Sequence, residues 1–212
     1  PTHAGSFDIA YLSCLPNFVI MAAGDANELV RMIKTSILID DRPSSFRFPR
    51  GSGLGYNINE DHLAIEIGKG RILQEGNSIA LINFGARLSA CQEALKYLSR
   101  KGFKITLVDA RFAKPFDTNL MDNILDHHEY ILTIEEGSIG GFSSIVLNYI
   151  HNQRKKNSSS KIQNLIFPDK FIDHNLPENQ YKEIGMDALS IEKKILSLIA
   201  SKEVNLKAIK NI

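Results

Sequence analysis

The chain has 212 residues and carries 25 basic and 24 acidic side chains, so its net charge is +1 at neutral pH. A balance this even gives no electrostatic footprint for nucleic acid or for an anionic membrane. Apolar residues make up 43% of the chain, yet no apolar run approaches the roughly 18 residues of a membrane span. Cys14 and Cys91 show neither a disulfide framework nor zinc-ligand spacing, so we expect a reducing compartment and a cytoplasmic protein.

The first fifty residues predict a strand-helix-strand unit that follows a short helix. Apolar residues at helical spacing favour a helix over 7–15, and the apolar run over 18–22 is typical of a strand covered on both faces. Asp25 can cap a second helix, with Glu28 three residues on to complete a capping box. The alternating run over 45–49 predicts a second strand, parallel to the first with a right-handed crossover. The side chains of the second helix that we expect to face the sheet are Leu29, Ile33 and Ile37.

The rest of the chain predicts a linker followed by a complete open α/β domain. Residues 53–75 lack a helical pattern, and we expect an interdomain linker with an extended piece around 63–67. From 76 to 212, buried strands alternate with amphipathic helices, which indicates a mostly parallel sheet with helices on both faces. The expected strands cover 79–85, 103–109, 130–134 and 162–167. Two expected helices cover 87–99 and 143–152, and two more are expected to begin at Asp117 and Asp187.

Two polar side chains frame the first unit and are candidates for one shared site. His3 precedes Gly5 in a predicted turn or helix start, and Arg50 ends the alternating strand. Taken singly, each is more often an ordinary surface residue. The pattern of residues around them favours a function.

That pattern consists of short motifs along the whole chain. In the first unit they are Pro1-Thr2-His3-Ala4-Gly5-Ser6-Phe7-Asp8, Pro16-Asn17, Asp25-Ala26-Asn27-Glu28 and Phe48-Pro49-Arg50-Gly51. Later they are Asp109-Ala110-Arg111-Phe112-Ala113-Lys114-Pro115, Glu135-Glu136-Gly137 and Pro168-Asp169-Lys170-Phe171-Ile172-Asp173-His174. Together they resemble the 1-deoxy-D-xylulose-5-phosphate synthases of the transketolase superfamily. The resemblance implies the end of a parallel-sheet pyrimidine-binding domain over 1–52, a linker over 53–75 and a transketolase C-terminal domain over 76–212.

The resemblance also implies a reaction. A complete enzyme of this family condenses pyruvate with glyceraldehyde 3-phosphate to give 1-deoxy-D-xylulose 5-phosphate and carbon dioxide, a step toward isoprenoids, thiamine and pyridoxal. His3 would lie beside the cofactor, where an imidazole can donate or shuttle a proton near neutral pH. Arg50 would bind the phosphate of the aldehyde substrate through its planar fork of donors.

The family's cofactors are thiamine diphosphate and Mg²⁺, and by the resemblance the residues that bind them belong to sequence before Pro1. No Gly-Asp-Gly magnesium motif occurs in the chain. We therefore expect a missing N-terminal part of the same enzyme as partner, a homodimer, and no cofactor-binding or metal-binding residues in this chain. We also expect no turnover by the chain alone.

Other interpretations stay open at this stage. A transketolase or the β subunit of a 2-oxoacid dehydrogenase would share the last domain, and the chain could be a non-catalytic dimerisation module. Glu135 and Glu136 fit helix-start or interdomain contacts better than catalysis. His174 is expected near the domain interface without an assigned role. His127 and His128 would diverge by about 100° on a helix, which makes them a poor metal pair.

Overall fold

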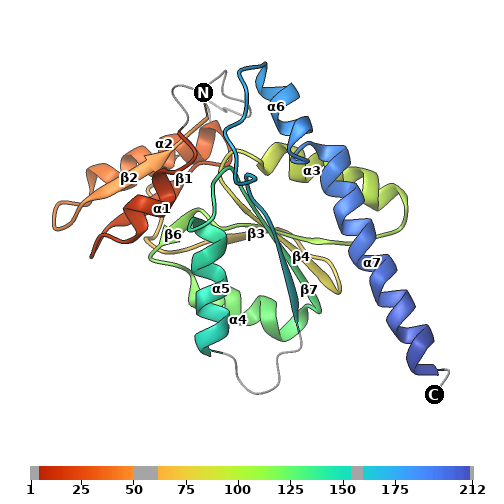
Figure 1. The fold of residues 1–212 in the computed structure, drawn as a ribbon. Helices are drawn as coiled ribbons and strands as arrows, with labels where there is room; N and C mark the ends of the chain where they lie inside the picture. The colour runs from red at the N-terminus through yellow and green to blue at the C-terminus, as the bar shows by residue number, and fades with distance from the viewer. Residues whose placement is uncertain (1–4, 50–61, 154–159, 211–212) are drawn as a thin grey trace.

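The computed structural model of the chain describes residues 5–49, 62–153 and 160–210. These residues form a three-stranded sheet beside a five-stranded sheet, with helices on both faces of the larger one (Figure 1). The α/β class expected from the sequence is confirmed.

The smaller sheet is built around β1 (Val19–Ala22), which is buried along its whole length. β1 pairs in parallel with β2 (Ser44–Arg47), as the strand-helix-strand pattern predicts. α1 (Asp8–Ser13) precedes β1, and α2 (Ala26–Ile37) forms the crossover to β2. On its other edge β1 pairs antiparallel with β6 (Phe112–Lys114), a short strand that the sequence pattern did not predict.

α2 begins as predicted but turns a different face to the core. The Asp25 carboxylate accepts a hydrogen bond from the backbone N–H of Glu28 at 2.8 Å, which confirms the cap. The expected stripe was wrong, because Ile33 and Ile37 are exposed and Leu29 is only partly buried. The buried side chains are Glu28, Met32 and Thr35. Glu28 is drawn inward by arginines from later in the chain, and the inward face of the helix includes it.

The larger sheet contains, in spatial order, β3 (Arg71–Gln74), β5 (Thr106–Asp109), β4 (Ile79–Phe84), β7 (Tyr130–Glu135) and β8 (Lys161–Leu165). β3 runs antiparallel to β5, and the other neighbours are parallel. The parallel strands are the ones that the sequence predicts. β3 falls within the range expected as a linker, so residues 71–74 extend this sheet by one edge strand.

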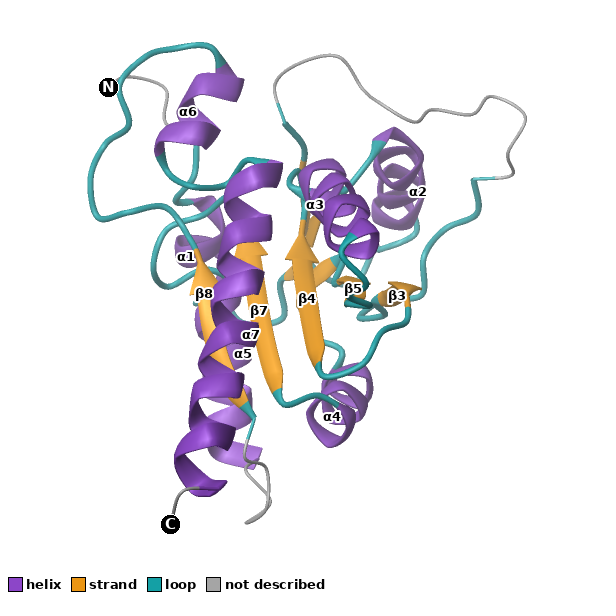
Figure 2. Cartoon of the chain, turned by 90° about the vertical axis from the view of Figure 1, so that its right-hand side faces the viewer, coloured by secondary structure: helices purple, strands orange, loops and turns teal. Residues whose placement is uncertain are grey.

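Helices cover both faces of the larger sheet, as predicted (Figure 2). α3 (Leu88–Arg100) and α7 (Ala188–Lys210) lie on one face, and α4 (Thr118–His127) and α5 (Phe142–Gln153) lie on the other. The predicted cap of α4 is confirmed, because the Asp117 carboxylate accepts from the backbone N–H of Leu120 at 3.0 Å. A further helix, α6 (Pro177–Glu183), lies beyond the carboxyl ends of the strands.

Each face of the larger sheet buries an apolar cluster. Between the sheet and α3 and α7, the cluster includes Leu81, Leu98 and Ile195. On the other face, the rings of Phe84 and Phe142 stack with centroids 4.7 Å apart. Each fully buried side chain of this kind stabilises the fold by about 1.5–3 kcal/mol. The second cluster also contains Ile9 of α1 and Ile20 of β1, so one core is shared by both sheets.

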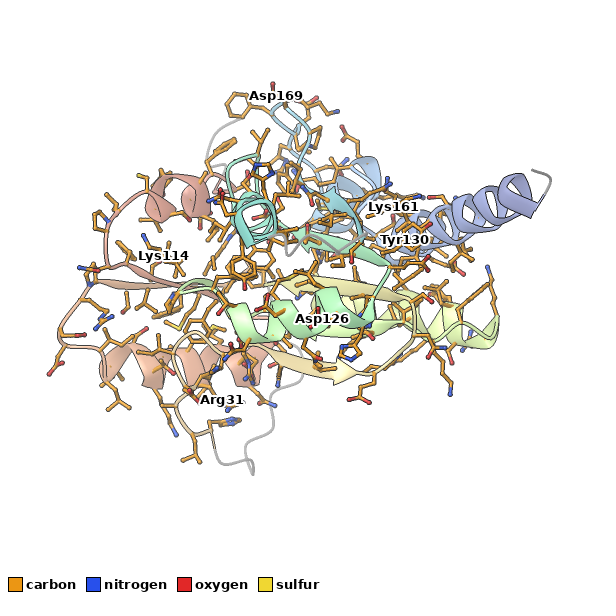
Figure 3. The ribbon with its side chains drawn as sticks, turned by 90° about the horizontal axis from the view of Figure 1, so that it is seen from below. Arg31, Lys114, Asp126, Tyr130, Lys161 and Asp169 are labelled. Atoms are coloured by element: carbon orange, nitrogen blue, oxygen red, sulfur yellow. The ribbon has the colours of Figure 1, made fainter. Side chains whose placement is uncertain are left out.

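Polar contacts reinforce this shared core. The backbone N–H of Ala22 donates to the carbonyl of Arg111 at 3.0 Å. The Lys114 ammonium donates to the carbonyl oxygens of Ser13 and Leu15 at the end of α1, at 3.1 and 2.6 Å (Figure 3). Residues 63–67 form no strand, but Ile65 is buried against β1 and α2. The smaller sheet with α1 and α2 and the larger sheet with its helices are therefore packed as one body.

The two cysteines provide a test of this packing. Cys91 is buried and burial raises the pKa of its thiol to about 12, whereas Cys14 is exposed. Because the thiolate is the reactive form, we expect one rapidly reacting thiol in the native chain and two in denaturant, measured with a chromogenic disulfide reagent. Cys14→Ser should abolish the rapid phase. Two rapid thiols in the native chain would contradict the burial of α3.

Candidate functional site

The most promising site lies where the strand order of the larger sheet changes direction. β5 lies on one side of β4 and β7 lies on the other, so a crevice is expected outside the carboxyl ends of β4 and β7. A hollow of about 190 Å³, counted with its opening to solvent, is found at this edge. Its walls are residues 84–86 and Glu136 from the larger sheet, and Ala22 and residues 47–49 from the smaller one.

Arg47 joins the two sides of this hollow. Its Nη2 donates to the backbone carbonyl of Glu136, and its Nε lies 3.4 Å from Asp8 Oδ2. The backbone N–H of Ser138 also donates to the carbonyl of Ser6 at 3.1 Å. The start of α1 and the end of β2 are thus both fastened to the loop that follows β7.

The two predicted site residues, His3 and Arg50, lie outside the described residues. The structure does describe the segments next to them. Asp8 comes five residues after His3, and Arg47 comes three residues before Arg50. The Asp8–Arg47 pair brings these two segments together, and the roles of His3 and Arg50 stay predictions.

Glu135 has a structural role in the described residues. Its side chain is fully buried at the end of β7, and it accepts hydrogen bonds from the backbone N–H groups of Phe142 and Ser143 at 2.8 and 2.7 Å. It therefore caps α5, although burial raises the pKa of its carboxyl group. A Cβ on Gly141 would lie 2.4 Å from Glu135 Oε2, so the glycine is required for this close approach. The helix-start interpretation of this residue is confirmed.

Glu136 contacts the segment that ends β2, which agrees with the second interpretation of the acidic pair, an interdomain contact. Its backbone carbonyl receives Arg47, and its carboxylate accepts a hydrogen bond from the hydroxyl of Tyr181 on α6. The Arg87 guanidinium lies 3.4 Å from the centre of the Tyr181 ring. Burial and the neighbouring Glu136 charge raise the pKa of Tyr181, so the hydroxyl stays protonated and donates. These contacts hold Glu136 in place at the wall of the hollow.

A buried group of charges lies beside α2. Glu28 is 1% exposed, and its Oε1 accepts from Arg31, Arg71 and Arg111 at 2.9, 3.0 and 2.9 Å. Arg71 Nη2 also lies 3.0 Å from the fully buried Asp109 Oδ2. The capping interpretation of Glu28 missed this network. The signal in the sequence was the charged Asp109-Ala110-Arg111 motif, which begins at the last residue of a buried strand.

The histidines give no metal site in the described part of the chain. His174 is exposed, and the ring nitrogens of His127 and His128 pair with the backbone carbonyls of Asn123 and Ile124. Across the described residues, no three His, Cys, Asp or Glu side chains are grouped to hold a metal ion. We assign none of the described residues to thiamine diphosphate or Mg²⁺. No helix in the described part combines the length and apolar character that crossing a bilayer requires.

Comparison with known proteins agrees with this arrangement. The family model of the transketolase C-terminal domain matches residues 68–191, and that of the transketolase pyrimidine binding domain matches residues 1–53. A probable 1-deoxy-D-xylulose-5-phosphate synthase 2, chloroplastic, from Oryza sativa subsp. japonica is 44% identical over 94% of this chain. The chain spans 28% of the length of that relative.

Two solved structures share the fold. A split gene transketolase, described as an inactive beta4 tetramer, matches 92% of this chain and 61% of its own, with a TM-score of 0.75 at 21% identity. A transketolase mutant from Pichia stipitis matches 92% of this chain and 27% of its own, with a TM-score of 0.66 at 19% identity.

The fold and the hollow define an open α/β protein with a hollow at a switch point of the sheet, the edge where ligands of such folds usually bind. The chain belongs to the transketolase family, as its match to the C-terminal domain shows. Its resemblance to the C-terminal portion of 1-deoxy-D-xylulose-5-phosphate synthases is confirmed.

The buried network predicts a pH dependence of stability. Burial raises the pKa of Asp109 from 3.8 to about 6, despite the opposing effect of Arg71. Between these values the folded chain retains a proton that the unfolded chain has released. The contribution of Asp109 to stability is therefore complete below pH 3.8 and is lost as the pH rises through about 6.

We expect the wild-type free energy of unfolding, relative to that of Asp109→Asn, to fall with rising pH across this window. The slope should reach at most about 1.4 kcal/mol per pH unit, measured by urea unfolding. Asp126→Asn, an exposed carboxylate on α4 (Figure 3), is the control and should keep the wild-type profile. Parallel profiles for wild type and Asp109→Asn would show that Asp109 does not titrate in this way.

Proposed function

We propose that this chain is the C-terminal part of a 1-deoxy-D-xylulose-5-phosphate synthase. The complete enzyme would condense pyruvate with glyceraldehyde 3-phosphate, with loss of carbon dioxide. The observation that carries the proposal is the Asp8–Arg47 pair, because it joins the two motif segments at the hollow of a transketolase-family fold. The 44% identity to the rice relative supports the choice of this reaction over the transketolase reaction.

In this proposal His3 and Arg50 act on the substrate. The imidazole of His3 would donate to an oxygen on which negative charge develops, or move a proton to it. The guanidinium of Arg50 would form paired, charge-assisted hydrogen bonds with the phosphate of the aldehyde. Thiamine diphosphate, when bound to the complete enzyme, supplies the electron sink for the carbon–carbon bond chemistry.

The remaining parts of the proposal concern what this chain lacks. We propose that the residues for thiamine diphosphate and Mg²⁺ lie in an N-terminal part of the same enzyme, so the chain alone would not turn over. The split gene transketolase that shares the fold is described as inactive, which supports this view. A homodimer and the domain division at 1–52 and 76–212 are likewise proposals. We also propose a cytoplasmic location for this chain. The name of the rice relative, by contrast, places that protein in the chloroplast.

The role of Arg50 can be tested in the complete enzyme with Arg50→Ala. Charge-assisted hydrogen bonds contribute about 1.5–3 kcal/mol each, so we expect KM for glyceraldehyde 3-phosphate to rise by about 10- to 100-fold. KM for pyruvate should change little. Arg42→Ala removes an exposed arginine that pairs only with Asp41 among the described residues, and it should leave both constants unchanged. Equal increases for both substrates with Arg50→Ala would rule out the phosphate role.

The role of His3 predicts a different kinetic effect. His3→Ala should lower kcat by about 100-fold or more, as expected for loss of a general acid or base. The midpoint of thermal unfolding should stay at the wild-type value. His127→Ala, a change at an exposed histidine on α4, is the matched control. An unchanged kcat in His3→Ala would remove His3 from the site.

A further inference from the structure

Arg47 is held from both sides of the hollow by groups that belong to different parts of the fold. β2 pairs with β1 up to this residue, and the backbone N–H of Ala23 donates to the Arg47 carbonyl at 3.0 Å. Its side chain then crosses to the larger sheet, where Nη2 donates to the Glu136 carbonyl. Arg47 is therefore part of the smaller sheet by its backbone and is tied to the larger sheet by its side chain.

The alternation of β2 explains why Arg47 and not its neighbours makes this crossing. The Phe46 ring packs against the core around β1 and α2, and it stacks on Phe48 with centroids 6.3 Å apart. Successive side chains of a strand point to opposite faces, so Arg47 is directed away from that core. On this side it meets Asp8 and the loop after β7.

The contacts of Arg47 show that it orients protein groups. Within the described part of the chain, its Nε pairs with Asp8 Oδ2 and its Nη2 donates to the Glu136 carbonyl, and its side chain is 16% exposed. Phe48 and Pro49, which follow directly, form a wall of the hollow and lead to Arg50. Moving the end of β2 would therefore move this wall relative to the larger sheet.

We propose that Arg47, with Asp8 as its partner, is a positioning residue that sets the Phe48–Pro49 wall against the switch point. Through this wall it determines how strongly the enzyme recognises the phosphate of its aldehyde substrate. The inference rests on the proposed function, because phosphate binding is assigned there to Arg50.

The experiment measures phosphate discrimination in the complete enzyme. Discrimination is the ratio of kcat/KM for glyceraldehyde 3-phosphate to kcat/KM for glyceraldehyde. A displacement of about 1 Å can cost up to about 100-fold, so we expect Arg47→Met to lower the ratio by about ten-fold. Arg47→Lys keeps the positive charge but lacks the planar guanidinium, so it should retain only part of the wild-type discrimination. Calorimetric binding of glycerol 3-phosphate, an unreactive analogue, should weaken in the same order.

Asp8→Asn separates positioning from direct phosphate binding by Arg47. If Arg47 only positions, loss of the Asp8 carboxylate should lower the ratio too, and the double variant should be no worse than Arg47→Met alone. If Arg47 bound the phosphate itself, Asp8→Asn would free the guanidinium and leave the ratio unchanged or higher. That result, or additive effects in the double variant, would overturn the inference.

Lys114→Met is the matched control, because Lys114 also ties the two parts of the fold together, but its ammonium donates to the carbonyls of Ser13 and Leu15 at the far end of α1 (Figure 3). It should change the ratio by less than about two-fold, since its contacts lie away from the hollow. An equal loss in Lys114→Met would show a general structural effect and overturn the inference. If Arg50→Ala lowers the ratio and Arg47→Met does not, only the present inference fails. If Arg50→Ala leaves the ratio unchanged, the phosphate assignment fails and the inference with it.

Discussion

Glu28, buried among three arginines, is the interaction on which the arrangement of the chain depends. A buried carboxylate is strongly unfavourable unless it is paired and hydrogen-bonded, and its partners here come from α2, β3 and the segment after β5. The ion pairs hold these three segments side by side. Removing one partner from such a buried group typically costs about 3–5 kcal/mol. The network therefore fixes the smaller sheet against the larger one, together with the β1–β6 pairing beside it.

The candidate site follows from that placement. Once β1 lies against the carboxyl edge of the larger sheet, β2 ends above the switch point between β4 and β7. The acidic pair at the end of β7, Glu135 and Glu136, then serves two local purposes. Glu135 caps α5 and Glu136 receives the contacts of Arg47 and Tyr181. Arg47 and Glu136 thus hold each other and Asp8 and Tyr181 at the hollow, beside the described segments that lead toward His3 and Arg50.

The sequence predicted the elements whose signal is local. The strands β4, β5 and β7 are buried along their whole length, and the caps at Asp25 and Asp117 depend on residues three positions away. It did not predict β3 or β6, because short edge strands acquire their pairing from distant partners. The prediction of which face of α2 is buried was wrong for the same reason. Its apolar periodicity favoured Ile33 and Ile37, but two distant arginines, Arg71 and Arg111, decided the outcome by drawing Glu28 inward.

Arg47 shows the same limit at the site itself. Its place in an alternating run predicted a strand, whereas its partners lie 39 positions before it and 89 positions after it in the chain. His3 and Arg50 were recognised only through motifs, since no local pattern distinguishes them from ordinary surface residues.

Native-state hydrogen exchange of this chain tests the central claim that both sheets form one cooperative body. The informative amides are those of Ala22, which donates to Arg111, and of Ile82 in the middle of β4. If the buried charges and the β1–β6 pairing join the sheets, both amides should exchange with the same opening free energy, that of global unfolding. Exchange of Ala22 at a clearly lower opening free energy than Ile82 would show that the smaller sheet opens on its own, and it would contradict the account.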